Sequence, residues 1–333
     1  MGRFGYLFKR IVSMDKKEMR SRLRAISKKT GRSKLYILND MRKCAVRYGA
    51  GYMDYDLYEM YDLTEEQRDT YITRGRNNDL VVRYNDPSMT YIFDNKIEFC
   101  ERFNDFLRRD WIPVTAGNRD KVIEFIRKHD IFMVKPADGS CGKGIEKIRR
   151  GEYASEDELY SRIMGYGGKY YLDEFIDQHS SISEIYSGSI NTVRVIAIRG
   201  RNGVHIICAY LRIGNAGRHV DNFNSGGMVA PVDEKTGIVK DKAIDKEKNV
   251  YIVHPSSGKE IMGFRIPFWD DITELVKKAG TVVPEVRYIG WDVAVTSNGP
   301  CLVEGNNFPG HDIYQLPGHV PDKTGIYKKF IIE

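Results

Sequence analysis

The 333-residue sequence has few cysteines, and their positions match neither a disulfide framework nor a zinc site. The five cysteines are scattered and no two share a CxxC spacing, so we expect reduced thiols that serve mainly in packing. The seven histidines form no HxxxH or HExxH pattern, which argues against a histidine-based metal site.

Long apolar runs are also missing. The most apolar stretches, within residues 191–198 and 204–211, end well before the length that spans a bilayer. No apolar segment with a small-residue cleavage site follows the start, and the first residues lack the Ser or Thr of an N-myristoylation signal. We therefore expect a cytoplasmic protein.

Acidic residues are scarce near the N-terminus. Residues 1–47 contain 15 lysines and arginines against three acids, whereas the remainder has a balance of −6 within an overall net charge of +6. This basic arm could dock on anionic lipid as a membrane-peripheral element, on an acidic polymer, or on the acidic body of the protein itself. A solvated helical face is an equally good interpretation, and no nucleic-acid partner is expected.

The hydrophobic pattern predicts an α+β protein with antiparallel-rich sheets. Helices are expected over 15–30 and 33–48, with a break at Thr30-Gly31-Arg32-Ser33 where Ser33 can cap the second helix. A tyrosine-rich entry segment (48–61) and a helix capped by Thr64 follow. Strands are expected at 131–136, 144–148, 170–176, 190–199, 203–213, 289–296 and 299–304. We divide the chain into a basic helical arm with its entry segment (1–85), a central part (86–183) and a C-terminal part (184–333).

A glycine-rich loop separates the first two of these strands. Lys135 lies on the first strand, and the loop then contains Gly139, Ser140, Gly142, Lys143 and Gly144. Glycines let backbone N–H groups approach phosphate oxygens, and a lysine adds charge. The loop matches neither GxxxxGK[ST] nor a GxGxxG that opens a helix. A phosphate-covering flap and a plain hairpin turn both remain open.

The last strand pair carries hard metal ligands. Asp292 lies on one strand and Glu304 twelve residues later on the next, followed by Asn306. Two strands joined by a tight turn can bring the two carboxylates opposite one another, facing the same way. Two carboxylates and a carboxamide oxygen suit Mg²⁺ shared with phosphate oxygens. The alternative is a pair of solvated strand acids.

Together these elements resemble the ATP-grasp superfamily, over roughly residues 90–310. In that family two lysines contact the nucleotide phosphates, and Lys96 and Lys135 stand at the matching positions. Residues 171–176 look like the linker that contacts adenine and ribose, with Glu174 as the hinge acid and Ile176 closing the motif. The resemblance implies a nucleotide held between two antiparallel-rich α+β subdomains after an N-terminal helical extension. It also implies ATP and Mg²⁺ as cofactors, with Asp292, Glu304 and Asn306 as the metal ligands.

More narrowly, residues 189–195, 221–227 and 291–310 resemble the sugar-transfer-associated ATP-grasp group, which is found with polysaccharide biosynthesis enzymes. One departure stands out: many ligases of the superfamily have an arginine two residues before the metal aspartate, where this chain has Gly290. Arg194 and Arg212 are our candidates for the missing catalytic cation, the alternative being surface strand charges.

Further candidates lie in the Gly/Asn-rich loop at 214–230 and, for one histidine, near the C-terminus. Asn222 and Asn224 could line the γ-phosphate side of the site, or belong to an ordinary Gly/Asn loop. His219 and His311 could serve an acceptor site, although single histidines are more often structural.

The resemblance implies a carboxylate–amine ligase that works through an acyl phosphate. Its small-molecule substrates would be a carboxylate and an amine, for example an amino acid and a sugar acid or cell-surface glycan precursor. Such chemistry needs positioning and charge neutralisation rather than a side-chain nucleophile, and no Ser-His-Asp or Cys-His arrangement is evident. The alternatives are an ATP-grasp kinase that phosphorylates a hydroxyl, and a non-catalytic binding module that docks through residues 1–47. Neither the oligomeric state nor the substrates can be read from the sequence.

Overall fold

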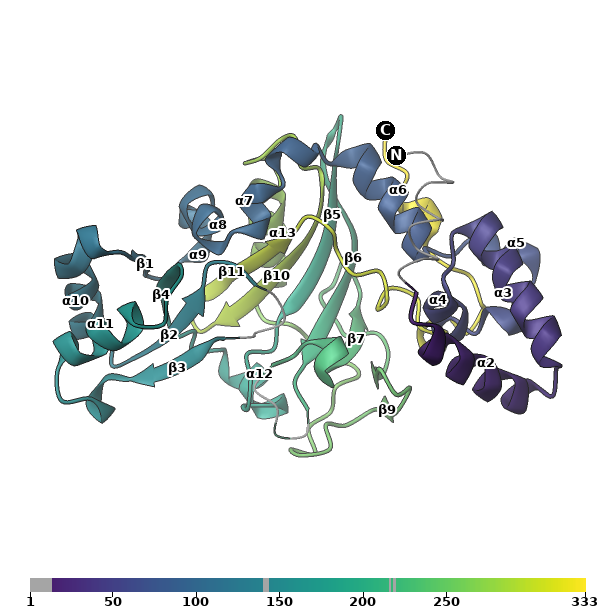
Figure 1. Ribbon diagram of the computed structural model, residues 1–333, viewed down its shortest axis with the longest axis horizontal. Coiled ribbons are helices and arrows are strands. Elements are labelled where there is room, and N and C mark those ends of the chain that lie inside the picture. Colours follow the sequence, from purple (N-terminus) through teal and green to yellow (C-terminus); the bar gives the residue numbers. More distant parts are fainter. Residues whose placement is uncertain (1–13, 140–143, 216, 218–219) are drawn as a thin grey trace. The chain divides into compact units, whose positions relative to one another are not determined.

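The computed structural model in Figure 1 describes residues 14–139, 144–215, 217 and 220–333. The chain forms two compact units: unit 1 contains the residues up to Arg83 together with Gly310–Ile332, and unit 2 contains Tyr84–Pro309 with Glu333. The final segment therefore belongs with the N-terminal helices, whereas the sequence had grouped it with the C-terminal part from residue 184.

Unit 1 is helical. Its α-helices are α2 (Lys16–Thr30), α3 (Lys34–Tyr48), α4 (Tyr52–Leu57), α5 (Glu65–Asp69) and α6 (Arg74–Tyr84), with 3-10 turns η1 (Met60–Asp62), η6 (Pro317–His319) and η7 (Tyr327–Phe330). The first two helices and their break at Gly31 were predicted correctly. Ser33 Oγ accepts a hydrogen bond from Tyr36 N at 3.2 Å, and Thr64 Oγ1 accepts one from Gln67 N at 3.3 Å, so both predicted N-caps are present.

Tyrosines of the entry segment fill the core of unit 1. Tyr55, Tyr58 and Tyr61 are buried with Ile37 and Met41 of α3. The C-terminal segment completes this packing, because Tyr58 Oη donates to the carbonyl of His311 at 2.8 Å. The helices of the predicted basic arm thus share one core with the entry segment.

Unit 2 begins with short helices and a four-stranded sheet. The helices are η2 (Pro87–Met89), α7 (Tyr91–Asp94), α8 (Lys96–Arg102) and α9 (Asn104–Leu107). The sheet has the order β1-β4-β2-β3 and consists of β1 (Trp111–Val114), β2 (Ile131–Pro136), β3 (Glu146–Arg149) and β4 (Tyr170–Glu174). Helices α10 (Arg119–Lys128) and α11 (Glu156–Met164) pack with it (Figure 1), burying Phe132, Val134 and Leu172. Turns η3 (Ala116–Asn118) and η4 (Arg150–Glu152) connect these elements.

A seven-stranded sheet follows, with the order β11-β10-β5-β6-β7-β8-β9. Its strands are β5 (Val193–Gly200), β6 (Gly203–Ile213), β7 (Met228–Val232), β8 (Ala243–Asp245), β9 (Val250–Tyr251), β10 (Tyr288–Thr296) and β11 (Gly299–Asn306). Helices α12 (Ser180–Ile185) and α13 (Trp269–Ala279) and the turn η5 (Phe223–Ser225) complete the unit. All strand pairs of both sheets are antiparallel, which confirms the predicted α+β class. Across the described residues, no helix is both long and apolar enough to cross a membrane.

Candidate functional site

The predicted metal ligands lie together at one end of the β10–β11 hairpin. Asp292 and Glu304 are directly opposite each other in the register, as the sequence predicted. The Asn306 amide nitrogen lies 3.3 Å from Glu304 Oε1 and 3.4 Å from the Gly290 carbonyl. Asp292 is buried, whereas Glu304 and Asn306 are partly exposed. The hairpin therefore gathers two carboxylates and a carboxamide with access to solvent.

Two arginines contact Asp292. Arg194 is its cross-strand neighbour on β5 and donates from Nε to Oδ1 and from Nη2 to Oδ2, the latter at 2.8 Å. Arg212, on β6, donates from Nη1 to Oδ2 at 2.8 Å. Both arginines are buried. The two predicted catalytic cations thus meet at the predicted metal aspartate, because β10, β5 and β6 are adjacent strands.

The two carboxylates of the hairpin differ in their electrostatics. Burial alone would raise the pKa of Asp292, but the positive charges of Arg194 and Arg212 lower this pKa well below its usual range. Burial, and then the negative charge of Asp292, raise the pKa of Glu304. Among the described residues no ion pair involves Glu304. Glu304 is therefore the carboxylate whose charge would be stabilised most by an added cation.

Gly290 lies at a tightly packed position beside the Arg194 side chain. A Cβ atom at residue 290 would lie 2.8 Å from Pro309 Cβ, 3.1 Å from Ile196 Cδ1 and 3.4 Å from Arg194 Cδ. The space beside this position is therefore already filled, in part by the stem of Arg194. A side chain at 290 would first have to displace Pro309, because that contact is the shortest.

Asp221 is a site residue that the sequence analysis missed. Its Oδ1 accepts from Arg212 Nη2 at 2.9 Å, and its Oδ2 accepts from both the backbone N–H, at 2.9 Å, and the hydroxyl of Thr192. Asp221 is buried, and burial raises its pKa despite the nearby Arg212. Arg212 is thus fixed between two aspartates. Asp221 lies in an irregular loop, so no hydrophobic periodicity in the sequence indicates its contacts with Arg212 and Thr192.

Asp173 is a second residue that was missed. It is fully buried and accepts from Lys135 Nζ at 2.5 Å and from Arg109 Nε at 2.7 Å. Arg109 also donates from Nη1 to the Leu302 carbonyl on β11. Although burial alone would raise the pKa of Asp173, these two cations lower it. The predicted phosphate lysine is therefore held by Asp173.

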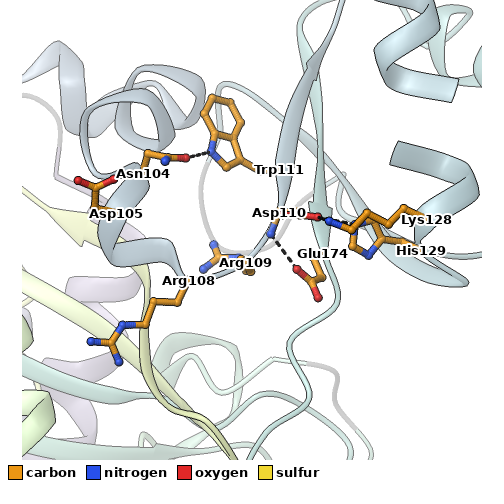
Figure 2. A pocket seen from close by; sticks show the side chains of 9 residues that line it. All are labelled: Asn104, Asp105, Arg108, Arg109, Asp110, Trp111, Lys128, His129 and Glu174. Carbon is orange, nitrogen blue, oxygen red and sulfur yellow. Dashed lines mark hydrogen bonds and ion pairs between the residues drawn. The ribbon is translucent and has the colours of Figure 1, made fainter. Parts of the chain in front are cut away.

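Glu174 and Ile176 occupy different surroundings from Asp173. Successive strand residues point to opposite faces, so Glu174 turns away from Lys135. Its Oε2 accepts from the backbone N–H of Asp110 at 2.8 Å (Figure 2). Ile176 packs with Ala294 and Cys301. The structure thus does not bring Glu174 together with Lys135, and its nucleotide role stays a prediction.

A cavity of about 510 Å³ lies on the Glu174 side. It is lined by Asn104, Asp105, Arg108, Arg109, Asp110, Trp111, Lys128, His129 and Glu174 (Figure 2). Asp110, His129 and Glu174 place potential ligand atoms within 4.8 Å of one another. However, Asp110 Oδ2 already receives hydrogen bonds from Lys128 Nζ and, at 3.1 Å, from the His129 ring. An ion-pair cluster accounts for this arrangement, and we assign no metal to it.

The first predicted phosphate lysine touches the start of the glycine-rich loop. Lys96 follows Asn95, whose Oδ1 accepts from Ile97 N at 2.9 Å and so starts α8. The Lys96 ammonium donates to the Gly139 carbonyl at 2.6 Å. Gly139 and Gly144 have φ values of 123° and 75°, which favour glycine. Ser140, Gly142 and Lys143 lie outside the described residues.

The remaining candidates are divided between the two units. Asn222 Oδ1 accepts from Asn224 N at 2.8 Å, so its side chain shapes its own turn beside Asp221. Asn224 is exposed. His219 lies outside the described residues. His311 belongs to unit 1, where its Nε2 lies 2.8 Å from the buried Asp54 Oδ1. The acceptor role of His311 stays a prediction.

The donor set of the hairpin fits Mg²⁺. Carboxylate and carboxamide oxygens are the ligands this ion prefers, and a divalent cation would relieve the repulsion between Asp292 and Glu304. Glu304 and Asn306 can supply oxygens most freely, because the Asp292 oxygens already accept from arginines. The metal assignment remains a prediction that the geometry allows.

Comparison with known proteins identifies a related family. The family described as "Sugar-transfer associated ATP-grasp" matches residues 75–321. No curated protein sequence matches the chain.

Solved structures with a similar fold include three ligases or synthetases. ATP-grasp ligase PsnB with a minimal precursor has 15% identity and a TM-score of 0.40, over 68% of this chain and 56% of that one. D-alanyl-alanine synthetase A from Vibrio cholerae has 13% identity and a TM-score of 0.45, over 77% and 70%. The purK N5-carboxyaminoimidazole ribonucleotide synthetase has 13% identity and a TM-score of 0.42, over 67% of this chain and 46% of that one. The chain thus spans about half the length of the PsnB and purK structures.

Proposed function

Because the chain belongs to the sugar-transfer associated ATP-grasp family, we propose that it is an ATP- and Mg²⁺-dependent carboxylate–amine ligase. The observation that carries this proposal is the buried cluster at Asp292, where two arginines and a metal-type carboxylate pair meet. Such a cluster can neutralise phosphoryl charge, which is the main demand of acyl phosphate chemistry.

The reaction has two steps. A substrate carboxylate oxygen attacks the γ-phosphorus of ATP, and the bond to the bridging oxygen breaks, releasing ADP and leaving an acyl phosphate. An amine nitrogen then attacks the acyl carbon, the C–O bond to phosphate breaks, and loss of a proton from nitrogen gives the amide. No protein nucleophile is needed, so the chain has to position the reactants and stabilise charge.

The residues have distinct parts in this scheme. Glu304 and Asn306, with Asp292 behind them, would hold Mg²⁺, which supplies charge neutralisation at the phosphate oxygens. Lys135, held by Asp173, and Lys96, at the start of the glycine-rich loop, would bind phosphate oxygens. Arg194 and Arg212, which both contact Asp292, would stabilise the transferring group.

We place the substrates among amino acids and sugar acids or other carboxylated glycan precursors. Support comes from the family description, which links this ATP-grasp group to sugar transfer.

ADP release in the presence of Mg·ATP and pooled carboxylates and amines tests the function. The expected result is ADP formation that requires both a carboxylate and an amine, with an amide as the product by mass spectrometry. Hydroxylamine should trap the acyl phosphate as a hydroxamate when the amine is omitted. Glu304→Gln is the matched inactive control. A phosphorylated hydroxyl product would instead establish a kinase, and failure to bind Mg·ATP would indicate a non-catalytic module.

A further inference from the structure

The outward face of α2 in unit 1 carries a row of basic side chains. Lys16, Arg20, Arg24 and Lys28 follow one another at four-residue spacing, which aligns them along about 18 Å of one helix face. All four are exposed, as is Lys17 beside them. In the part of the chain that the structure describes, no ion pair or side-chain hydrogen bond involves these four residues. We call them the basic row.

Other cations of the same two helices are matched by acids of unit 1. Arg22 pairs with Glu18 and Asp56, and Lys29 pairs with Glu59. On α3, Lys43 and Arg47 both pair with Glu65, whose N-terminal helical position also favours an acid. The fold therefore neutralises the cations that face its own acids and leaves the basic row without a counterpart.

The basic row is unfavourable for the helix that carries it. Like charges at i and i+4 repel each other on a helix surface, and the row contains three such pairs in succession. Lys16 also lies at the N-terminal end, where the helix dipole disfavours a cation. Unit 1 does not offset this repulsion with acids of its own. Binding of an anionic partner would relieve the repulsion, so the basic row favours such binding.

Helix α3 adds exposed apolar side chains. Leu35 and Val46 are 66% and 64% exposed, and Arg42 lies between them on the same helix face. Both helices bury their opposite faces in one core, through Ile26 of α2 and Ile37 of α3. Cations together with protruding aliphatic groups match the boundary between headgroups and acyl chains. An acidic polysaccharide or nucleic acid would use the charges but not the aliphatic groups.

We propose that the outward faces of α2 and α3 form a docking surface for an anionic lipid bilayer. The basic row binds the headgroups, and Leu35 and Val46 enter the interface. This association is independent of the reaction in unit 2 and needs no spanning helix. It would place the enzyme at a membrane where lipid-linked or surface-bound substrates are available.

Sedimentation of the full chain with vesicles tests this surface. Vesicles of phosphatidylcholine with phosphatidylglycerol should bind the protein, pure phosphatidylcholine should not, and high salt should release it. The variant Arg20→Gln/Arg24→Gln/Lys28→Gln should weaken binding about 100-fold, since each surface cation contributes about five-fold. The control Lys29→Gln/Lys43→Gln/Arg47→Gln has the same net charge, and its binding should stay within about three-fold of the wild type.

Two further measurements keep the outcome clear. Circular dichroism and thermal melting of both triple variants should match the wild type, and Leu35→Ser/Val46→Ser should weaken vesicle binding without changing the salt dependence. Equal losses in the two triple variants would overturn the proposal, because net charge alone would then explain binding. Retention by a soluble acidic polysaccharide without binding to vesicles would also overturn it.

Discussion

Glu304→Gln should separate the stability of unit 2 from its activity. In the ligand-free protein the charged Glu304 lies directly opposite Asp292, and like charges at such positions destabilise a sheet by about 0.2–1 kcal/mol. Glutamine keeps the shape and the hydrogen bond with Asn306 but removes the charge. The ligand-free variant should therefore be more stable than the wild type by about 0.2–1 kcal/mol.

The sign of the pH dependence follows from the raised pKa of Glu304. At low pH the carboxyl group is protonated in both the folded and unfolded states, so it costs no stability. As the pH rises above the pKa of the unfolded chain, the folded state resists ionisation and loses stability relative to the unfolded state. The advantage of the variant should thus grow as the pH rises through the titration of Glu304 and disappear under acidic conditions.

Ligand binding should reverse the order. A ligand at 100 times its dissociation constant stabilises the folded state by about 2.7 kcal/mol. Mg·ATP should therefore stabilise the wild type more than Glu304→Gln, because the variant offers the metal a neutral carboxamide oxygen in place of a carboxylate. Thermal melting with and without Mg·ATP, at neutral and acidic pH, measures both effects, and the ligand-sensitive transition identifies unit 2. An unchanged turnover, or equal stabilisation by Mg·ATP, would refute the metal role of Glu304.

Three further substitutions probe the contacts around the site. Asp173→Asn should lower the free energy of unfolding by about 3–5 kcal/mol at neutral pH, because it leaves Lys135 and Arg109 without their anion. Since the pKa of Asp173 is lowered in the folded state, this difference in stability should shrink as the pH falls. Unfolding measured over a series of acidic pH values checks this. Asp221→Asn should lower kcat about 100-fold through a misplaced Arg212 while the KM for ATP stays within about two-fold, and equal effects on both would indicate a purely structural role. Gly290→Ala should cost about 1–3 kcal/mol in a melting experiment through overpacking, and an unchanged melting temperature would contradict the contact described above.

Local signals in the sequence predicted the framework of the site well. The hairpin itself follows from strand alternation and a two-residue turn, which are local properties. A regular register continued from that turn would place Val303 opposite Asp292, and a β-bulge between Asp292 and Val293 shifts the pairing so that Glu304 lies there instead. The start of α8 at Lys96 follows from the capping residue Asn95. The meeting of Arg194 with Asp292 depends on the pairing of β5 with β10, which no local signal in the sequence indicates.

Contacts between distant segments were not predictable in the same way. Asp173 and Glu174 are adjacent acids, and only the pairing of β4 with β2 decides which of them faces Lys135. Asp221 lies in the loop between β6 and β7, and its contacts with Arg212 and Thr192 depend on how this loop folds back onto β6 and the start of β5. The return of the C-terminal segment to unit 1 is likewise non-local, because nothing near Gly310 in the sequence indicates its partner.

The division of unit 1 into two chain segments has a consequence for the order of folding during synthesis. Apart from Glu333, unit 2 is synthesised after Arg83 and before Gly310, so it can fold while unit 1 still lacks its last segment. Until then Tyr58 has no His311 carbonyl to bind, and Gln315 is not yet present to bond both backbone groups of Ile72. The nascent chain would therefore acquire a nucleotide site before its helical unit is complete. A docking surface on that unit would become fully stable only once the whole chain has left the ribosome.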